Sequence, residues 1–442
     1  MKSSKNSLSP YQAVLDKIYK LGRFGIKLEL DTIQNILKRL GNPHKNYNIV
    51  HIAGTNGKGS TGSYIASILQ KAGFKTGFYT SPHLVRFNER ITINGIEISD
   101  DAVVSAYKAV ERVDIGKRKA TFFETATAMG FYHFAKKNVD WAVIETGMGG
   151  RFDATNVVQP QVSVITNLSI EHTEYLGNTI KALANEKGGI IKEGTPVITG
   201  VSQASGLQII KKIAEEKKAT LYIYKRNFCT RKQKLKACYN YEGLFQPFTD
   251  LKKSLPGKHQ KENMSLALAA IEIIFSKCQK KDSRYLLTAQ LIKEGLISAK
   301  WPGRLENIME NPLIILDGAH NLKASKVLGK HLSATLADKK LTLILGILDD
   351  KPYEKMLEHL VPFAHKVIIT KAKIDRSLPA DTLKKSACRL TSVPVDIVED
   401  VKNAVKTAID MTDKADAICI AGSLYVAGEA KELFDEGLFL AT

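Results

Sequence analysis

Residues 48–60 read NIVHIAGTNGKGS, and the predicted architecture can be built outward from this stretch. Residues 48–52 predict a strand, and a helical pattern begins at Lys58. A strand, a glycine-rich turn and a helix are the context of a phosphate loop, in which backbone N–H groups and a helix N-terminus bind phosphate. Lys58 would reach the β- and γ-phosphates of a nucleotide, and Ser60 would offer its hydroxyl to Mg²⁺. A glycine-rich turn with a chance lysine stays the alternative, because Ile52 and Gly59 break the usual G-x4-G-K-[ST] spacing.

Strands and helices alternate along two stretches of the chain, which predicts an α/β fold. In the first stretch the predicted strands cover 48–52, 75–80, 141–144, 162–166 and 196–199. Helices are expected at 58–72 and 125–137. The near-continuous apolar strands indicate a doubly wound, mostly parallel sheet. From residue 312 the alternation restarts, with strands at 313–316, 341–345, 367–370, 395–398 and 417–421.

These two stretches predict two domains. We expect an N-terminal domain that carries the phosphate loop (1–297), a linker reading SAKWPGR (298–304), and a smaller Rossmann-like domain (305–442). Ligands of two-domain α/β proteins often bind between the domains, at the carboxyl ends of the strands, and we expect the chemistry there.

Composition narrows the class of protein. The chain has 64 Lys+Arg against 45 Asp+Glu, a net charge of +19 that suits polyanionic ligands. It has no run of ~18 apolar residues, no apolar signal core in its first ten residues, and no C-x-x-C among its five cysteines. The basic run at 225–236 contains one aromatic residue, which favours a solvated face over a nucleic-acid site. We therefore expect a cytoplasmic protein without nucleic-acid or membrane partners.

Three further polar segments narrow the reaction. Glu145 comes directly after the strand at 141–144, where a carboxylate beside a phosphate loop suits Mg²⁺; a helix cap or ion-pair partner is the alternative. His172 follows the strand at 162–166 and could bind metal or phosphate, although a lone histidine is usually structural. Lys187, within EKGGIIK (186–192), is by itself better explained as an exposed helical lysine.

Taken together, these segments resemble those of the folylpolyglutamate synthase and dihydrofolate synthase family of the Mur ligase superfamily. The resemblance runs almost from end to end and includes ETGMGGRFDATN (145–156), SPHL (81–84), ERI (89–91), FFE (122–124), HQ (259–260), PGR (302–304), DGAHN (317–321), DK (350–351) and GSL (422–424). It implies an ATP-dependent amide ligase that activates a folate or dihydropteroate carboxylate as an acyl phosphate and joins it to L-glutamate. A Mur-type peptidoglycan-precursor ligase is the alternative, which ETGMGGRFDATN, SPHL and FFE disfavour.

The resemblance also assigns roles to residues. It implies that ATP is bound by Thr55, Asn56, Gly57, Lys58, Gly59, Ser60, Thr61, Asn263, Arg304 and Asp317. It implies two Mg²⁺ sites, one with Ser81, Glu145 and nearby Ser60 and the other with His172. The substrate positions are Phe123, Glu124, Arg151, Phe152, Asp153 and Ala154. The catalytic set is Lys58, His172, Lys187 and His320, with Lys187 modified to a carbamate that turns a cation into a carboxylate.

Three departures from the family's pattern stand out. Gly188 replaces the alanine usual after the modified lysine, Glu171 replaces the aspartate usual before the metal histidine, and 25–29 lacks the glycine often seen before the leucine of the substrate loop. The last departure bears on the pterin contacts of that loop and not on the chemistry.

The expected partners are folates or dihydropteroate, L-glutamate and ATP, and the chain is expected to act as a monomer.

Overall fold

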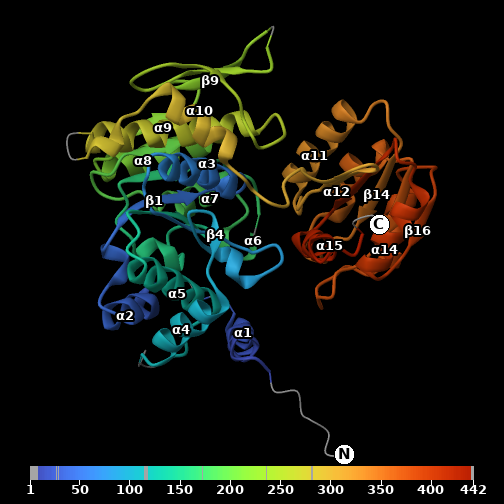
Figure 1. The fold of residues 1–442 in the computed structure, drawn as a ribbon, viewed down its shortest axis with the longest axis horizontal. Coiled ribbons are helices and arrows are strands. Elements are labelled where there is room, and N and C mark those ends of the chain that lie inside the picture. The colour runs from blue at the N-terminus through green and yellow to red at the C-terminus, as the bar shows by residue number, and fades with distance from the viewer. Residues whose placement is uncertain are drawn as a thin grey trace, which may run out of the picture. The chain divides into compact units, whose positions relative to one another are not determined.

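The computed structural model describes residues 8–25, 27, 29–113, 118–171, 173–234, 236–279 and 282–439. The chain divides into two compact units. Unit 1 comprises Met1–Ser254 and Gln260–Lys300, and unit 2 comprises Leu255–His259 and Trp301–Thr442. The chain therefore joins unit 2 twice, first briefly at Leu255–His259 and then to its end. Each unit has its own main sheet (Figure 1).

The main sheet of unit 1 has eight strands in the order β4-β3-β2-β5-β1-β6-β7-β8. They are β1 (Asn48–Ala53), β2 (Thr76–Tyr79), β3 (Ile91–Ile93), β4 (Ile96–Glu97), β5 (Trp141–Glu145), β6 (Val162–Ile165), β7 (Val197–Thr199) and β8 (Leu221–Ile223). From β2 to β8 neighbouring strands are parallel, and β3 and β4 add an antiparallel edge. The predicted parallel sheet is confirmed, and β1 lies at its centre, so that the turn after β1 has strand ends on both sides.

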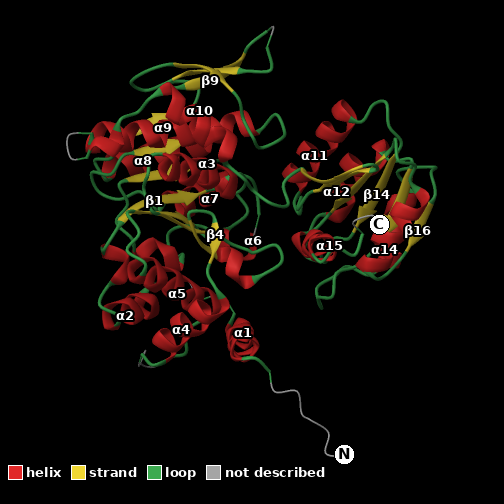
Figure 2. Ribbon diagram, in the orientation of Figure 1, coloured by secondary structure: helices red, strands yellow, loops and turns green. Residues whose placement is uncertain are grey.

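Helices cover both faces of this sheet (Figure 2). They are α1 (Pro10–Lys20), α2 (Asp31–Arg39), α3 (Lys58–Lys71), α4 (Asp100–Glu111), α5 (Phe122–Lys136), α6 (Thr173–Leu176), α7 (Ile180–Gly188), α8 (Ala204–Glu216), α9 (Gln260–Cys278) and α10 (Ala289–Ser298). Strand β1 shows why both faces are apolar. Ile49 packs in the core under α5, Ala53 packs in the core under α7 and α8, and Ile52 faces α3 at Gly62. Alternate side chains of a buried strand thus serve opposite helix layers.

A second, three-stranded sheet of unit 1 was not predicted. It consists of β9 (Cys229–Lys232), β10 (Tyr239–Glu242) and β11 (Phe248–Leu251), all antiparallel. The basic run lies along β9, and Lys225, Arg226, Arg231 and Lys232 are exposed.

A buried carboxylate fastens this small sheet to α9. Glu272 is 1% exposed, and its oxygens accept hydrogen bonds from Tyr241 Oη (2.6 Å) and from the backbone N–H groups of Leu244 (2.8 Å), Phe245 (3.0 Å) and Gln246 (3.0 Å). This one buried acid of α9 therefore accepts hydrogen bonds from three backbone N–H groups of the turn between β10 and β11.

Replacing Glu272 with alanine should lower the free energy of unfolding by about 3 kcal/mol, because four donors lose a buried acceptor. Urea unfolding followed by circular dichroism measures this loss. Glu294→Ala is the matched control, since Glu294 is an exposed residue of α10 that accepts a hydrogen bond from Gln290 in the preceding turn. Equal midpoints for the two variants would contradict this role of Glu272.

Unit 2 is a second α/β layer structure. Its strands are β12 (Glu306–Glu310), β13 (Leu313–Leu316), β14 (Leu341–Leu345), β15 (Lys366–Ile369), β16 (Val395–Ile397) and β17 (Ala417–Ala421), in the order β12-β13-β17-β14-β15-β16. All five predicted strands are present and parallel, and β12 is an added antiparallel edge. The helices are α11 (Leu322–Thr335), α12 (Tyr353–Leu360), α13 (Ala380–Cys388), α14 (Val401–Met411) and α15 (Leu424–Asp435).

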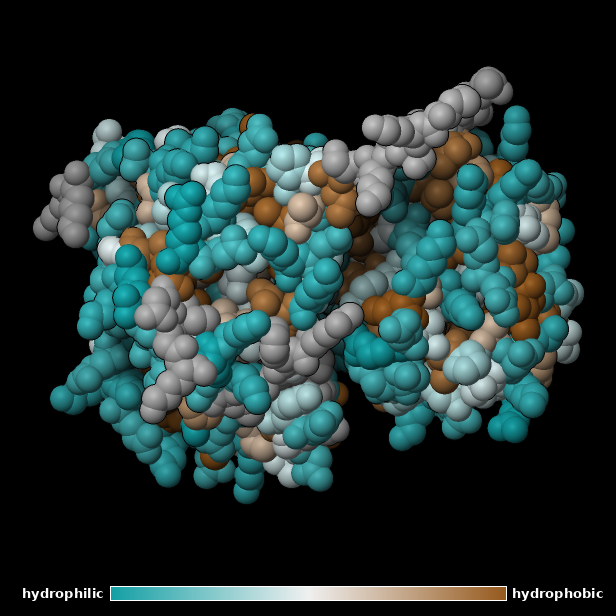
Figure 3. Space-filling view, turned by 90° about the horizontal axis from the view of Figure 1, so that it is seen from below, coloured by the Kyte–Doolittle hydropathy of each residue, from teal (hydrophilic) through white to brown (hydrophobic). Residues whose placement is uncertain are grey.

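One face of the molecule shows how polar and apolar residues are distributed on it. Hydrophilic residues dominate the face drawn in Figure 3, with apolar residues in small separate areas. Within the described part of the chain, no helix combines the length and apolar character that crossing a membrane requires.

Candidate active site

The turn between β1 and α3 has the backbone geometry of a phosphate loop. Gly57 caps α3 with φ 85°, and Gly54 has φ 145°, conformations that favour glycine. A Cβ on Gly54 would collide with Thr166 Oγ1, and one on Gly57 would collide with the Asn263 side chain. Both glycines are therefore required by the close approach of neighbouring elements as well as by φ. The first N–H groups of α3 remain available to an anion.

The end of β6 fixes the loop in place. Asn56 O accepts hydrogen bonds from Thr166 Oγ1 (2.8 Å) and Asn167 Nδ2 (2.7 Å), and Asn56 N donates to Asn167 Oδ1 (3.2 Å). Thr55 N donates to Asn167 O (2.9 Å). Thr166 and Asn167 were not assigned a role from the sequence, although their place directly after a buried strand, next to the strand of the loop, was a usable signal.

Lys58 and Glu145 lie together at the carboxyl ends of β1 and β5. Lys58 Nζ is 3.7 Å from Glu145 Oε1, and Ser81 N, just after β2, donates to Glu145 Oε2 (3.4 Å). Both side chains are largely buried, with exposed fractions of 13% and 6%. The strand order β2-β5-β1 explains the meeting, because the ends of adjacent parallel strands share one sheet edge.

The donors around Glu145 fit a divalent cation. Ser81 Oγ is buried and has no hydrogen-bond partner among the described residues, although the backbone of the same residue contacts the carboxylate. A hydroxyl oxygen and a carboxylate are ligands that Mg²⁺ prefers. Over the described ranges no three His, Cys, Asp or Glu side chains form a metal cluster. His172, the predicted ligand of a second Mg²⁺, lies outside the described residues.

Lys187 is buried beside the loop and is not the exposed helical lysine that its own segment favoured. It is 1% exposed at the end of α7, and Nζ donates to Gly54 O (3.1 Å) and Glu171 Oε1 (3.1 Å). Burial lowers the pKa of Lys187 to about 8; the nearby charge of Glu171 opposes this shift and that of Lys58 adds to it. An amine with this pKa is partly neutral near pH 8, which is the form that reacts with CO₂.

Close packing explains Gly188, which follows Lys187 at a position where the family usually has alanine. A Cβ at Gly188 would lie 2.5 Å from Ile213 Cδ1 of α8, so α7 and α8 approach more closely here than alanine would allow without a shift of Ile213. This contact is on the α8 side of the helix, and it leaves the Lys187 side chain directed to Gly54 and Glu171.

The predicted substrate residues divide into exposed and buried groups. Arg151 and Phe152 are exposed, Phe152 by 39%. Asp153 is buried, and its carboxylate accepts from Met148 N (2.9 Å) and Thr155 N (3.0 Å), so that it holds the glycine-rich turn after β5. Burial raises the pKa of Asp153, and these hydrogen bonds oppose the rise. Ala154 is buried at the start of a 3-10 helix (Ala154–Val157).

Phe123 and Glu124 lie in the first turn of α5. The Phe123 ring lies against Gly147, where a Cβ would collide with it. Glu124 is 4% exposed, completes a capping box with Thr121, and pairs with Arg118 through both oxygens (2.9 and 2.7 Å). Arg118 received no role in the sequence analysis, and no local pattern marked it.

The start of α9 lies against the start of α3. Gln260 Nε2 donates to Ser60 Oγ (3.2 Å), and Asn263 Nδ2 donates to Gln260 Oε1 (2.8 Å). Asn263, predicted to contact ATP, is therefore adjacent to Gly57 of the loop. Gln260 was noted in the sequence without a role; its three-residue spacing from Asn263 places the two on one helix face.

The unit 2 residues form their own cluster at the end of β13. Asp317 Oδ2 accepts from Leu305 N (2.8 Å) and Oδ1 from Ala319 N (2.9 Å). Burial raises the pKa of Asp317, and the positive charge of Arg304 opposes the rise. His320 Nδ1 lies 2.8 Å from Gly318 O, and a Cβ on Gly318 would lie 2.5 Å from Arg304 Nη1. Arg304, Asp317 and His320 are thus neighbours within unit 2.

Family models match both halves of the chain. The Mur ligase middle domain matches residues 52–271, and the Mur ligase glutamate ligase domain matches residues 303–424.

Individual proteins match over nearly the whole length. A dihydrofolate synthase/folylpolyglutamate synthase of Bacillus subtilis is 36% identical over 434 residues, covering 96% of this chain and 98% of the relative. The crystal structure of Mycobacterium tuberculosis folylpolyglutamate synthase with ADP and AMPPCP has a TM-score of 0.87 at 31% identity, covering 96% of this chain and 99% of that one. The crystal structure of a bifunctional folylpolyglutamate synthase/dihydrofolate synthase with Mn, AMPPNP and L-glutamate bound has a TM-score of 0.83 at 28% identity, covering 97% of this chain and 98% of that one.

Proposed function

This chain belongs to the folylpolyglutamate synthase and dihydrofolate synthase family of Mur ligases, and on that premise we propose how its residues perform the family's reaction. It is an ATP-dependent ligase that joins L-glutamate to a pteroyl carboxylate. The peptidoglycan-precursor alternative is not supported, since the full-length relatives are folate enzymes. We propose further that it accepts both dihydropteroate and reduced folates, as the Bacillus subtilis relative's double name states of that protein.

The observation that carries the proposal is the meeting of Lys58, Glu145 and Lys187 around the phosphate loop. Lys58 is 3.7 Å from Glu145, and Lys187 Nζ is 3.1 Å from the carbonyl oxygen of Gly54. Charged side chains are costly to bury, and a cluster of them beside an anion-binding helix end is more typical of a functional site than of the fold. Here two lysines and two carboxylates, Glu145 and Glu171, lie at the end of the helix that binds phosphate.

ATP would bind with its phosphates on the N–H groups of 55–61, and Lys58 would neutralise charge on the transferring phosphoryl group. The substrate carboxylate attacks the γ-phosphorus and releases ADP, and the amino group of glutamate then attacks the acyl phosphate and expels phosphate. The protein supplies mainly position and charge, because two substrates and ATP must meet in one orientation.

Two divalent cations are proposed, with Ser81, Glu145 and Ser60 as protein ligands of one and His172 of the other. When bound, they would neutralise phosphate charge and orient the phosphate oxygens. The resemblance supports further roles. We propose that ATP is also contacted by Asn263, Arg304 and Asp317, and that His320 lies near the transferred phosphoryl group. The proposed substrate contacts are Phe123, Glu124, Arg151, Phe152, Asp153 and Ala154. Monomeric, cytoplasmic action stays a prediction, which light scattering and cell fractionation would check.

The test is product formation by purified protein with Mg-ATP and glutamate. One reaction contains dihydropteroate and another contains a reduced folate, and phosphate release and product mass are followed in both. We expect one added glutamate in the first reaction and further glutamates in the second. Product in only one reaction would refute dual specificity, and product in neither would refute the proposed substrates.

A further inference from the structure

One arginine in unit 1 pairs with two carboxylates from distant segments. Arg118 donates through Nη1 and Nη2 to the two oxygens of Glu124 (2.9 and 2.7 Å) and through Nε to Glu29 Oε1 (2.5 Å). Glu29 lies two residues before α2, and Glu124 lies in the first turn of α5. The exposed fractions are 5% for the Glu124 side chain, 26% for Arg118 and 48% for Glu29.

The fold does not need Arg118 to bind both carboxylates. Thr121 and Glu124 already satisfy the N-terminus of α5 through the capping box, with Thr121 N to Glu124 Oε2 at 2.8 Å and Glu124 N to Thr121 Oγ1 at 3.2 Å. The Glu29 side chain is half exposed, and ion pairs with such an exposed partner contribute little to folding stability. A planar guanidinium that uses three donors on two acids is instead well suited to fixing their relative position.

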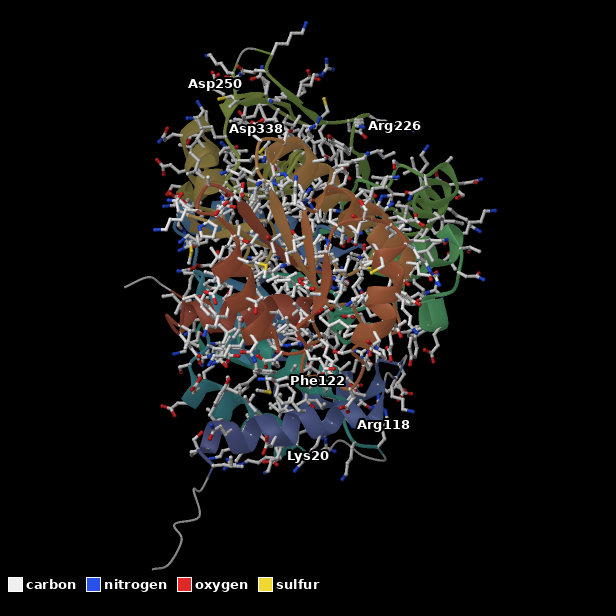
Figure 4. All side chains as sticks on the ribbon, turned by 90° about the vertical axis from the view of Figure 1, so that its right-hand side faces the viewer. Lys20, Arg118, Phe122, Arg226, Asp250 and Asp338 are labelled. Atoms are coloured by element: carbon white, nitrogen blue, oxygen red, sulfur yellow. The ribbon has the colours of Figure 1, made fainter. Side chains whose placement is uncertain are left out.

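The N-terminus of α5 also contacts two further segments. The Phe122 ring stacks on Tyr19 of α1 with centroids 5.9 Å apart, and the Phe123 ring lies against Gly147. Gly147 is two residues from Glu145, which contacts Lys58. Three consecutive residues of α5 therefore connect α1, the entry to α2 and the glycine-rich turn of the candidate site. Figure 4 shows Arg118, Phe122 and Lys20 together at one end of unit 1.

We propose that Arg118 is a positioning residue that sets the affinity for the pteroyl substrate by holding Glu29 and Glu124 together at the start of α5. This inference rests on the proposed function. Arg118 does not take part in phosphoryl transfer, so its loss should be felt in substrate binding rather than in the chemical step.

Steady-state kinetics of the full-length enzyme test the proposal. Glu29→Gln removes the negative charge that faces Arg118 Nε while leaving the Arg118–Glu124 pair intact, and it should raise KM for the pteroyl substrate about tenfold, with kcat and KM for ATP unchanged within about twofold. Arg118→Ala should raise this KM by at least as much. Arg118→Lys keeps the positive charge but loses the planar guanidinium, and its KM should lie between those of the wild type and Arg118→Ala. In an Arg118→Ala background, Glu29→Gln should have no further effect.

The matched control is Glu242→Gln. Glu242 is also a half-exposed glutamate (56%) paired with an arginine, Arg231, at 3.1 Å, but it lies on β10. That sheet is at the opposite end of unit 1, where Figure 4 labels Arg226 and Asp250. The control should leave every kinetic constant unchanged.

The possible outcomes distinguish failure of the positioning role from failure of the proposed function. An unchanged pteroyl KM in Glu29→Gln, with an active wild type, would overturn the positioning role and leave the proposed function intact. A fall of kcat and of the thermal midpoint together with a rise of both KM values would also overturn it, since it would show a structural role. A wild type inactive on both pteroyl substrates would remove the proposed function, and the inference with it.

Discussion

Replacing Lys58 with alanine should lower kcat by about 10³-fold, because in the proposed mechanism Lys58 neutralises charge on the transferring phosphoryl group. Lys58 is the first residue of α3, its side chain is 13% exposed, and Nζ is 3.7 Å from Glu145. The loop N–H groups remain in the variant, so nucleotide binding should weaken far less than turnover. Coupled phosphate release gives kcat, and fluorescence titration with a nucleotide analogue gives the affinity.

The matched control is Lys71→Ala, at the other end of the same helix, where the side chain is exposed. It should keep full activity. Thermal unfolding of Lys58→Ala must show a folded protein for the comparison to hold, and Lys58→Arg supplies a variant that keeps the charge. Near-normal turnover in a folded Lys58→Ala protein would contradict the role given to the loop.

Replacing Lys187 with alanine should abolish turnover, by about 10³-fold or more, and short carboxylic acids should partly restore it. If Lys187 works as a carbamate, the variant lacks a buried carboxylate, and acetate or formate can occupy the vacated space. Methylamine at the same concentration is the discriminating control, because it would replace an amine that acts as the cation partner of Glu171. Restoration by the amine and not by the acids would contradict the carbamate.

The pH dependence of the wild type follows from the same residue. With a pKa of about 8, roughly half of Lys187 is neutral at pH 8 and about a tenth at pH 7, against far less than 1% for an ordinary lysine. Only the neutral amine combines with CO₂. The reaction forms the N–C bond of the carbamate and releases a proton, so deprotonation of the amine and formation of the carbamate are both favoured by raising the pH. At constant CO₂ pressure, carbamate and activity should therefore rise from pH 7 upward until every Lys187 is modified, and enzyme stripped of CO₂ should recover on adding it.

The sequence predicted the central part of the fold because buried parallel strands are marked by their own residues. The runs at 48–52, 141–144 and 162–166 are continuously apolar or nearly so, and all became adjacent strands. Strands β3, β4, β8 and β12 of the two main sheets were missed because strands at or next to a sheet edge are only partly buried, and three of these four are also short. Leu255–His259 was missed as part of unit 2 because no change in composition marks so brief a crossing.

In the candidate site, too, some residues could be predicted from the sequence and others could not. Lys58 and Glu145 follow buried strands, and the order of those strands brings them together, so position along the chain was informative. The burial of Lys187 is a tertiary property, since it depends on Gly54 and Glu171, residues far away in sequence, and only resemblance pointed to it. Arg118 had no local signal, because its partners Glu29 and Glu124 are 89 and 6 residues away.

The central claim is that the pteroyl carboxylate takes the γ-phosphoryl group of ATP before glutamate is joined to it. Substrate labelled with ¹⁸O in that carboxylate tests the claim directly, with mass spectrometry of the phosphate released by wild-type enzyme. We predict one ¹⁸O atom in the phosphate for each amide bond formed. Amide product with unlabelled phosphate would contradict the acyl phosphate and the account built on it.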